Sequence, residues 1–252
     1  MSAAKVNNQG SLTRINRDFY DKLWCGVELY QGSAFNTWPA LSSHVEQCPE
    51  RLEIGPGLRP RLPVRGTRFV DLSRVAVARL NEAGGQAVEG SLEALPIEDE
   101  SISLLCAFDV LEHVDDDRKA LSEITRVLRS GGVLFLSVPL YQSAWTGFDE
   151  VVGHARRYEP DELLGLLSEY GVTVRQSAAY GMQLESRVIT KLGMWFLKHF
   201  SGMALRFYNK FVFPKQINKQ QPLVFKPGII RDHQVDEVVM ECVKRKPEAS
   251  GD

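Results

Sequence analysis

Two glycines at the end of a short apolar run are the first residues whose type and spacing suggest chemistry. The segment 52–57 reads LEIGPG, so Gly55 and Gly57 directly follow residues typical of a buried strand. Because neither glycine has a Cβ, a ligand can approach the backbone closely there. The segment therefore predicts a turn that cradles a nucleotide-like cofactor. A glycine turn with no ligand is the alternative that so short a motif leaves open.

The prolines around this turn bear on the kind of cofactor. In dinucleotide-binding turns, G-x-G-x-x-G opens a helix whose free N–H groups bind a pyrophosphate. Here Pro60 stands at the third glycine position, and Pro56 and Pro63 also lack backbone donors. A pyrophosphate would be poorly bound. A cofactor without phosphates, such as S-adenosylmethionine, needs only the close backbone approach.

Two acidic residues end apolar stretches farther along the chain. Asp71 follows Arg68–Val70, and Asp109 follows the continuous apolar run Ile102–Phe108. An acid at the carboxyl end of a strand, shortly beyond a glycine turn, is placed to accept hydrogen bonds from ribose hydroxyls. Asp71 is therefore predicted to bind a cofactor ribose.

Alternating strands and helices are expected to position these residues. After the strand that ends at the glycine turn, the patterns predict strands at Arg68–Asp71, Gln86–Val88, Ile102–Phe108, Val133–Val138, Val172–Ser177 and Glu237–Lys244. Helices are predicted after the N-cap Ser73, from Asp115–Asp117 to Gly131–Gly132, and from Pro160. This order is typical of a doubly wound, mostly parallel α/β sheet that binds its ligand at the carboxyl ends of the strands.

Five short motifs occur in order between Arg51 and Val174. They are Glu53-x-Gly55-x-Gly57, Asp71-Leu72-Ser73, Leu95-Pro96, Asp109-Val110-Leu111-Glu112-His113 and Arg126-Val127-Leu128-x-x-Gly131-Gly132. Together they resemble the class I S-adenosylmethionine-dependent methyltransferases, most nearly the small-molecule, ubiquinone-biosynthesis-like branch. The resemblance implies a Rossmann-like methyltransferase fold with a seven-stranded sheet, whose last strand is antiparallel, and S-adenosylmethionine as cofactor.

The resemblance also implies a set of cofactor-binding residues. They are Glu53, Gly55, Pro56, Gly57, Asp71, Leu72, Ser91, Leu92, Phe108 and Asp109. In the family pattern, the glycine turn borders the methionine end of the cofactor, the acid after the second strand binds the ribose, and positions 91–92 contact the adenine. Two departures stand out: Arg59 replaces a frequent third glycine, and Ser91 replaces the usual acid.

Two histidines are candidates for a general base. Methyl transfer from a sulfonium is an in-line displacement that mainly requires positioning, and a base is needed only if the nucleophile arrives protonated. His154 lies in the loop after the fifth predicted strand, where such folds place substrate contacts. His113 belongs to the Glu-His pair of the fourth motif, for which a structural role is the alternative.

Aromatic and basic residues outside the motifs are predicted to contact the substrate. They are Tyr20, Trp38, Trp145, Arg156, Arg157 and Tyr158. The two arginines suit a carboxylate or phosphate clamp, or else a solvated pair beside Glu159 and Asp161. The N-terminal aromatics suit either a lid over the cofactor or plain core packing.

No metal site is predicted. The four cysteines occur singly, without a C-x-x-C pair or a histidine at ligand spacing: Cys25, Cys48, Cys106 and Cys242. They are interpreted as reduced thiols of a cytoplasmic protein.

The chain divides into four expected segments. Residues 1–45 form an N-terminal helical lid whose helix starts near Ser11, 46–181 the cofactor-binding α/β core, 182–232 a helical insertion, and 233–252 the last strand and tail. The stretch 182–231 carries nine Lys and Arg residues against one acid, Glu185, with aromatic residues between them. It could cap an apolar acceptor pocket, lie on an anionic membrane surface, or form a dimer interface.

The composition and net charge narrow the classes of function that the chain could have. The chain has 252 residues, 44% of them hydrophobic, and a formal net charge of −2, which gives no case for nucleic-acid binding. No signal peptide and no bilayer-spanning run are apparent. The sequence therefore favours a cytoplasmic enzyme, with peripheral membrane contact as a further possibility, that methylates a small-molecule or lipid-like acceptor. A catalytically inactive binding subunit of the same fold is the alternative.

Overall fold

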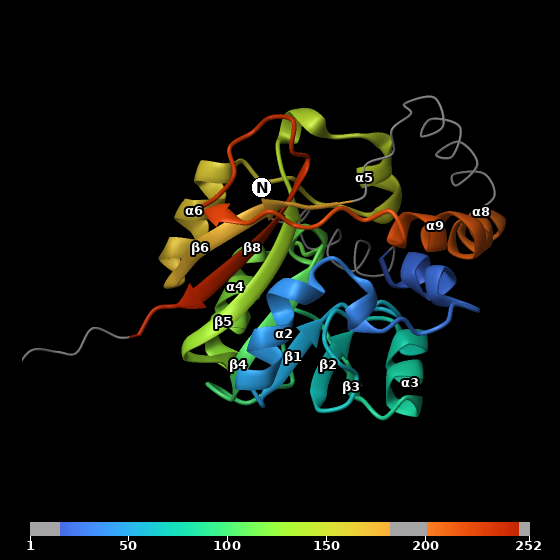
Figure 1. The fold of residues 1–252 in the computed structure, drawn as a ribbon, viewed down its shortest axis with the longest axis horizontal. Helices are drawn as coiled ribbons and strands as arrows, with labels where there is room; N and C mark the ends of the chain where they lie inside the picture. Colours follow the sequence, from blue (N-terminus) through green and yellow to red (C-terminus); the bar gives the residue numbers. More distant parts are fainter. Residues whose placement is uncertain (1–15, 182–200, 247–252) are drawn as a thin grey trace, which may run out of the picture.

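One mixed sheet forms the centre of the molecule (Figure 1). The computed structural model describes residues 16–181 and 201–246. The strands are β1 (Arg51–Ile54), β2 (Thr67–Asp71), β3 (Gln86–Glu89), β4 (Ile102–Phe108), β5 (Leu128–Pro139), β6 (Val172–Ala179), β7 (Lys226–Pro227) and β8 (Glu237–Lys244). Their order across the sheet is β3-β2-β1-β4-β5-β8-β6-β7.

The direction of the strands matches the expected doubly wound fold. Strands β1 to β5 pair in parallel, and β8 runs antiparallel between β5 and β6, as the resemblance implied. Within residues 16–181 and 201–246 the sheet has eight strands rather than the expected seven, because the two-residue strand β7 adds to the edge of β6. From β1 the chain first builds outward through β2 and β3, then returns to place β4 on the other side of β1. The crevice between β1 and β4 is therefore the switch point at which such sheets bind ligands.

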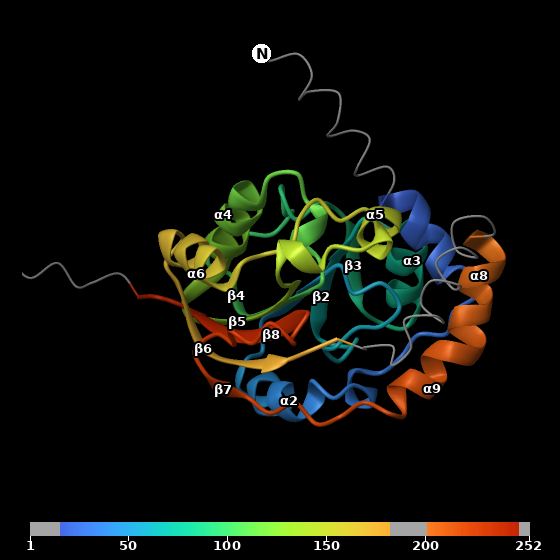
Figure 2. The same ribbon diagram turned by 90° about the horizontal axis from the view of Figure 1, so that it is seen from above.

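Helices cover both faces of the sheet (Figure 2). Helix α2 (Trp38–Gln47) lies on one face, and α4 (Asp117–Val127) and α6 (Pro160–Glu169) lie on the other. Side chains of β4 alternate between them: Cys106 packs in the cluster that contains Leu41 of α2, whereas Leu105 packs with Leu121 of α4. This alternation follows from the two-residue period of a strand.

Further helices and helical turns occur among the described residues. They are a helix at 16–24, α3 (Arg74–Glu82), α5 (Gly147–Val152), α8 (Ser201–Phe207), the π-helical turn η4 (Tyr208–Val212), α9 (Phe213–Ile217), and the 3-10 turns η1 (Gly32–Ala34), η2 (Leu111–His113) and η3 (Gln142–Ala144). Helix 16–24 lies beside α8 and η4 in both views, and Leu23 and Trp24 share a buried cluster with Leu205.

Local signals placed one helix boundary correctly and missed others. Ser73 caps α3, since its side chain accepts a hydrogen bond from the Ala76 N–H group. The helix predicted to reach Gly131–Gly132 was too long, because the backbone becomes extended at Leu128 and continues as β5. The predicted loop after β5 contains α5, which begins with a capping box between Thr146 and Asp149.

Some expectations lie outside the described residues. These are the start of the N-terminal helix at Ser11, residues 182–200 of the insertion, and the tail after 246. Among the residues that are described, no helix has the length and apolar character required to cross a bilayer.

Candidate active site

The glycine turn lies at the carboxyl end of β1, beside the switch point. Gly55 and Gly57 have φ angles of +64° and +54°, a region in which side chains are rarely tolerated. The Asp71 carboxylate accepts hydrogen bonds from the N–H groups of Gly57 (2.8 Å) and Ser73 (2.7 Å). Asp71 therefore joins the end of β2 to the turn after β1. Burial raises the pKa of Asp71 to about 6.

Glu53 stabilises the loop that follows the glycine turn. It is 1% exposed, and its carboxylate accepts hydrogen bonds from the backbone N–H groups of Arg61 (2.8 Å) and Leu62 (2.9 Å). Burial raises the pKa of Glu53 to about 7. The contacts of this carboxylate organise the proline-containing loop after the turn, and a contact with the methionine end of a cofactor remains a prediction.

Strand β4 brings Asp109 to the opposite side of the crevice. Asp109 has a φ angle of +54°, uncommon for a residue other than glycine. It is held by Ser137 of β5, whose hydroxyl donates to Asp109 Oδ1 (2.5 Å) and accepts from the Asp109 N–H group (2.9 Å). The preceding Phe108 is buried. The strained backbone at Asp109 is thus anchored where the predicted methionine site would be.

The other predicted cofactor residues follow β1, β2 and β3. Pro56 is buried within the turn and Leu72 is half-buried after β2. Leu92 packs into the main core, and the half-buried Ser91 accepts a hydrogen bond from the Glu93 N–H group (3.2 Å). All predicted cofactor residues therefore lie at the carboxyl ends of β1, β2 and β4 or in the segments that follow β1 to β4, at one edge of the sheet.

Helix 16–24 crosses this edge. Trp24 packs directly on Gly57, where a Cβ would lie 2.0 Å from the Trp24 Cζ2 atom. The Ser73 hydroxyl donates to Asp21 (2.5 Å), and the Tyr20 hydroxyl lies 3.0 Å from His113 Nε2. These contacts span the ends of β1, β2 and β4 and favour the lid interpretation of the N-terminal segment, which remains a prediction.

The two candidate bases lie side by side with different surroundings. Their rings meet edge to face, 4.6 Å between centroids. His154 Nδ1 lies 2.8 Å from Asp149 Oδ1, and His113 Nδ1 lies 3.1 Å from the Gly153 carbonyl oxygen. Burial, with a further contribution from His154, lowers the pKa of His113 to about 3. His113 is therefore neutral, and its Nε2 faces the Tyr20 hydroxyl.

Comparison with known proteins relates part of the chain to methyltransferases. The sequence profile described as a methyltransferase domain matches residues 62–136. A Mycobacterium tuberculosis protein named as a probable S-adenosylmethionine-dependent methyltransferase is 32% identical over 106 residues, 40% of this chain and 39% of that relative. The malonyl-[acyl-carrier protein] O-methyltransferase of Enterobacter lignolyticus is 31% identical over 116 residues, 41% of this chain and 46% of that enzyme. The chain therefore spans less than half the length of either relative.

A solved structure extends the similarity of fold over nearly the whole chain. An S-adenosylmethionine-dependent methyltransferase of Thermotoga maritima superposes with a TM-score of 0.57 at 16% identity, covering 97% of this chain and 96% of that one. The chain therefore has the Rossmann-like fold of class I methyltransferases. The likeness to the ubiquinone-biosynthesis branch stays a prediction.

The two arginines predicted to contact the substrate are paired with acidic residues of this chain. Arg157 pairs with Asp149 through Nε (2.8 Å) and Nη2 (3.0 Å), and Arg156 pairs with Asp117 (2.6 Å). The expected neighbours Glu159 and Asp161 are not these partners, since Asp161 pairs with Arg231. The arginines thus brace the loop that carries His154, and substrate binding by either stays a prediction.

The three remaining substrate candidates differ in exposure. Tyr158 is buried, with its hydroxyl 3.2 Å from Asp117 Oδ2. Trp145 is half-buried at the end of η3, and Trp38 is half-buried at the start of α2, against the core on the far side from α4. Tyr158 therefore has a packing role, and the other two remain predictions.

Sequence reasoning missed Asp149, the central residue of the His154 environment. Asp149 is fully buried and contacts His154, Arg157 and Thr146. These hydrogen bonds outweigh burial and hold its pKa well below the ordinary value. The spacing Thr146-x-x-Asp149 is that of a capping box and would have marked the residue.

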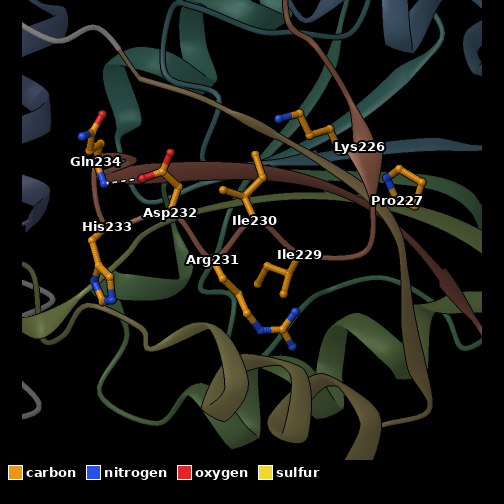
Figure 3. Close-up of a pocket in the computed structure, with 8 residues that line it drawn as sticks. All are labelled: Lys226, Pro227, Ile229, Ile230, Arg231, Asp232, His233 and Gln234. Atoms are coloured by element: carbon orange, nitrogen blue, oxygen red, sulfur yellow. Dashed lines mark hydrogen bonds between the residues drawn. The ribbon is translucent and has the colours of Figure 1, made fainter.

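A surface pocket lies away from the glycine turn (Figure 3). Its lining consists of Lys226, Pro227 and Ile229–Gln234. The Asp232 side chain accepts from the Gln234 N–H group, and Arg231 points toward α6, where it pairs with Asp161. None of the predicted site residues lines this surface pocket.

Proposed function

We propose that the chain binds S-adenosylmethionine at the glycine turn and transfers its methyl group to a small-molecule or lipid-like acceptor. The observation that carries the proposal is the position of Gly55 and Gly57, both with positive φ, at the β1–β4 switch point. Backbone at such a position can approach a ligand closely. The similarity to named S-adenosylmethionine-dependent methyltransferases supports the same assignment.

Asp71 and Asp109 are placed to contact the ribose and the methionine end of this cofactor, respectively. Each Asp71 oxygen accepts one backbone N–H group and retains a lone pair for a ribose hydroxyl. Asp109 lies across the crevice, where its negative charge would favour the cationic methionine end. The cofactor carries an already activated methyl group, so positioning supplies most of the catalysis.

The histidine pair lies on the acceptor side of this arrangement. In the transfer, the acceptor lone pair forms a bond to the methyl carbon while the carbon–sulfur bond breaks and its electrons return to sulfur. A hydroxyl acceptor must also lose a proton. We favour His154 over His113 for contact with the acceptor, because Asp149 orients its ring and leaves Nε2 available, whereas His113 Nε2 already faces Tyr20.

An apolar acceptor fits the surroundings of the turn. Helix 16–24 and the insertion border the turn with an apolar cluster that contains Leu23, Trp24, Leu205 and Tyr208. Arg59, which replaces a frequent third glycine of the family pattern, stacks on Phe213 of α9. We propose that these two segments act as lid and cap, and that the exposed face of α8 brings the protein to a membrane when the acceptor is lipid-like.

Calorimetry with S-adenosylmethionine tests the cofactor assignment. We expect binding by the full chain and at least a tenfold loss of affinity in Asp71→Ala. Asp161→Ala, which removes an exposed carboxylate, is the matched control. No binding at millimolar cofactor would refute the enzyme function, and full affinity in Asp71→Ala would refute the ribose contact.

A labelled-methyl transfer screen tests the acceptor class. Extracts separated into lipid, small-molecule and protein pools are incubated with the chain and cofactor carrying a labelled methyl group. Label is expected in the lipid or small-molecule pool. Cofactor binding without transfer to any pool would instead support the binding-subunit alternative.

A further inference from the structure

Three potential metal ligands meet on the acceptor side of the crevice. Glu112, His113 and His154 each offer one ligand atom, and these atoms lie within 4.8 Å of one another. We propose that the three residues bind a divalent transition-metal ion, with Zn²⁺ the best fit to two imidazoles and one carboxylate. The position of the ion next to the acceptor rests on the proposed function, whereas metal binding itself does not.

The ring nitrogens are set for coordination. A carboxylate and a carbonyl oxygen can only accept hydrogen bonds, so the contacts with Asp149 and Gly153 place a proton on Nδ1 of both histidines. Each Nε2 then presents a lone pair. Outer partners of this kind, a carboxylate for one histidine and a backbone carbonyl for the other, orient metal-binding imidazoles.

The carboxylate is also available. Glu112 is 1% exposed, and among the described residues its Oε2 atom has no hydrogen-bond partner. Its Oε1 atom lies 3.9 Å from His154 Nε2. Ligand atoms of a tetrahedral ion with bonds of about 2.1 Å lie roughly 3.4 Å apart. The Glu112–His154 pair therefore needs to close by about half an ångström, and no pair of ligand atoms needs to close by more than about 1.4 Å, since all lie within 4.8 Å of one another.

The charge balance favours a cation at this point. Two buried carboxylates border the histidines here: Asp149 lies 2.8 Å and Glu112 3.9 Å from the His154 ring nitrogens. Among the residues that the structure describes, Arg157 is the cation that contacts this cluster, and it is already paired with Asp149. A divalent ion would neutralise Glu112 and supply the missing partner of its second oxygen.

The backbone holds the three ligands in place before any ion binds. Glu112 and His113 are adjacent in η2, and His154 follows Gly153, the left-handed cap of α5. The Ala155 N–H group donates to the Glu112 carbonyl oxygen (2.7 Å), which joins the two segments. The sequence indicated no metal site because the ligands come from two distant segments that only the fold brings together.

A metal here would change the role of His154 from proton acceptor to ligand. Three protein ligands leave an open position of the kind found in catalytic sites. An acceptor hydroxyl bound there would lose its proton to water more readily, and its oxygen would then attack the methyl carbon. The Tyr20 hydroxyl, 3.0 Å from His113 Nε2, is the group that must yield to the ion.

Titration of the metal-stripped full chain with Co²⁺ tests the proposal. We expect one equivalent to bind, with visible absorption typical of a coordinated ion, and Zn²⁺ to displace it. His154→Ala and Glu112→Gln should weaken binding at least tenfold. His44→Ala, which alters a half-buried histidine of α2, is the matched control and should bind as the parent does.

Two further variants separate coordination from a structural role. Asp149→Asn should weaken Co²⁺ binding by about 10- to 100-fold, because the orientation of His154 is lost. Tyr20→Phe should bind Co²⁺ at least as tightly as the parent, because the competing hydroxyl is gone. Thermal melting of each variant confirms that it is folded.

The result of the metal-binding test does not depend on the cofactor assignment. No uptake of Co²⁺ or Zn²⁺ at millimolar concentration, or unchanged binding by His154→Ala, would overturn the metal site. S-adenosylmethionine binding measured on the same metal-stripped sample decides the proposed function separately. Cofactor binding without metal binding would leave His154 as the proton acceptor.

Discussion

Trp24 lies so close to Gly57 that this position has no room for a side chain: a Cβ there would be 2.0 Å from the Trp24 Cζ2 atom. The φ angle of +54° adds backbone strain for any other residue. The pair joins the predicted cofactor turn to the predicted lid. Any change at Gly57 should therefore affect both.

Gly57→Ala should displace helix 16–24 and weaken S-adenosylmethionine binding at least tenfold, as measured by calorimetry. Gly57→Ala combined with Trp24→Ala should restore part of the stability lost in Gly57→Ala, because the clash is relieved while the φ strain remains. Gly165→Ala is the control: a Cβ there meets no atom within 4 Å, and alanine favours the helix. Equal cofactor affinity of Gly57→Ala and the parent would contradict close backbone approach at this turn.

The Arg59 side chain connects the turn to the insertion. Its guanidinium lies 3.3 Å from the Phe213 ring centroid and donates to Asn209 Oδ1 (2.7 Å). A desolvated cation–π contact is worth up to about 2 kcal/mol, and the hydrogen bond adds to it. Arg59→Ala should lower the free energy of unfolding by roughly 1–3 kcal/mol in urea titrations. The exposed Arg65→Ala should change it by less than about 0.5 kcal/mol; equal effects would exclude a stabilising stack.

Arg59 also marks the limit of what sequence patterns predict. The strand ends at Asp71 and Asp109, the cap at Ser73 and the antiparallel last strand follow from local residue patterns or from the family resemblance, and the fold confirms them. Arg59 appeared only as a departure from a glycine pattern. Its partner Phe213 lies in the insertion, whose position no local pattern specifies.

The histidine site shows the same limit. His113 and His154 were both identified from sequence, but their contact depends on α5, a helix inside a segment interpreted as a loop. For Arg156 and Arg157 the sequence offered a substrate clamp or a solvated pair beside Glu159 and Asp161. The partners Asp117 and Asp149 are brought to them by packing of the loop against η2 and α4. Ion pairs between residues far apart in the sequence depend on the tertiary structure, which local sequence patterns do not specify.

The buried Glu53 predicts an unusual dependence of stability on pH. Its pKa is raised from 4.5 to about 7, so the folded state binds its proton more tightly than the unfolded state does. Between these two values the folded chain carries more bound protons, and its stability therefore falls as pH rises, by up to ~1.4 kcal/mol per pH unit. Asp71, raised to about 6, acts in the same direction.

Glu53→Gln should flatten this dependence. Urea titrations of the parent and Glu53→Gln at pH values from 4.5 to 7.5 measure the free energy of unfolding of each. As pH rises, the parent should lose stability relative to Glu53→Gln, and the difference should level off above about pH 7. Glu82→Gln changes an exposed carboxylate at the end of α3 and should leave the profile of the parent unchanged. A difference that does not vary with pH would rule out a raised pKa at Glu53.

The exposed face of α8 and η4 predicts binding to anionic membranes. Met203, Phe207 and Phe211 recur at helical spacing and are 57%, 57% and 48% exposed, with Arg206 and Lys210 beside them. Burial of a single exposed phenylalanine is worth about 1.5–3 kcal/mol when complete, and the basic residues add attraction to an anionic surface.

Sedimentation with anionic vesicles measures this contact. The parent chain should co-sediment, less so at high salt because screening weakens the charge term. Phe207→Ser with Phe211→Ser should reduce partitioning at least tenfold, whereas Val88→Ser, which removes an exposed apolar residue from β3, should not. Equal partitioning of parent and double variant, or no preference for anionic over neutral vesicles, would leave α8 as a cap of the acceptor site alone.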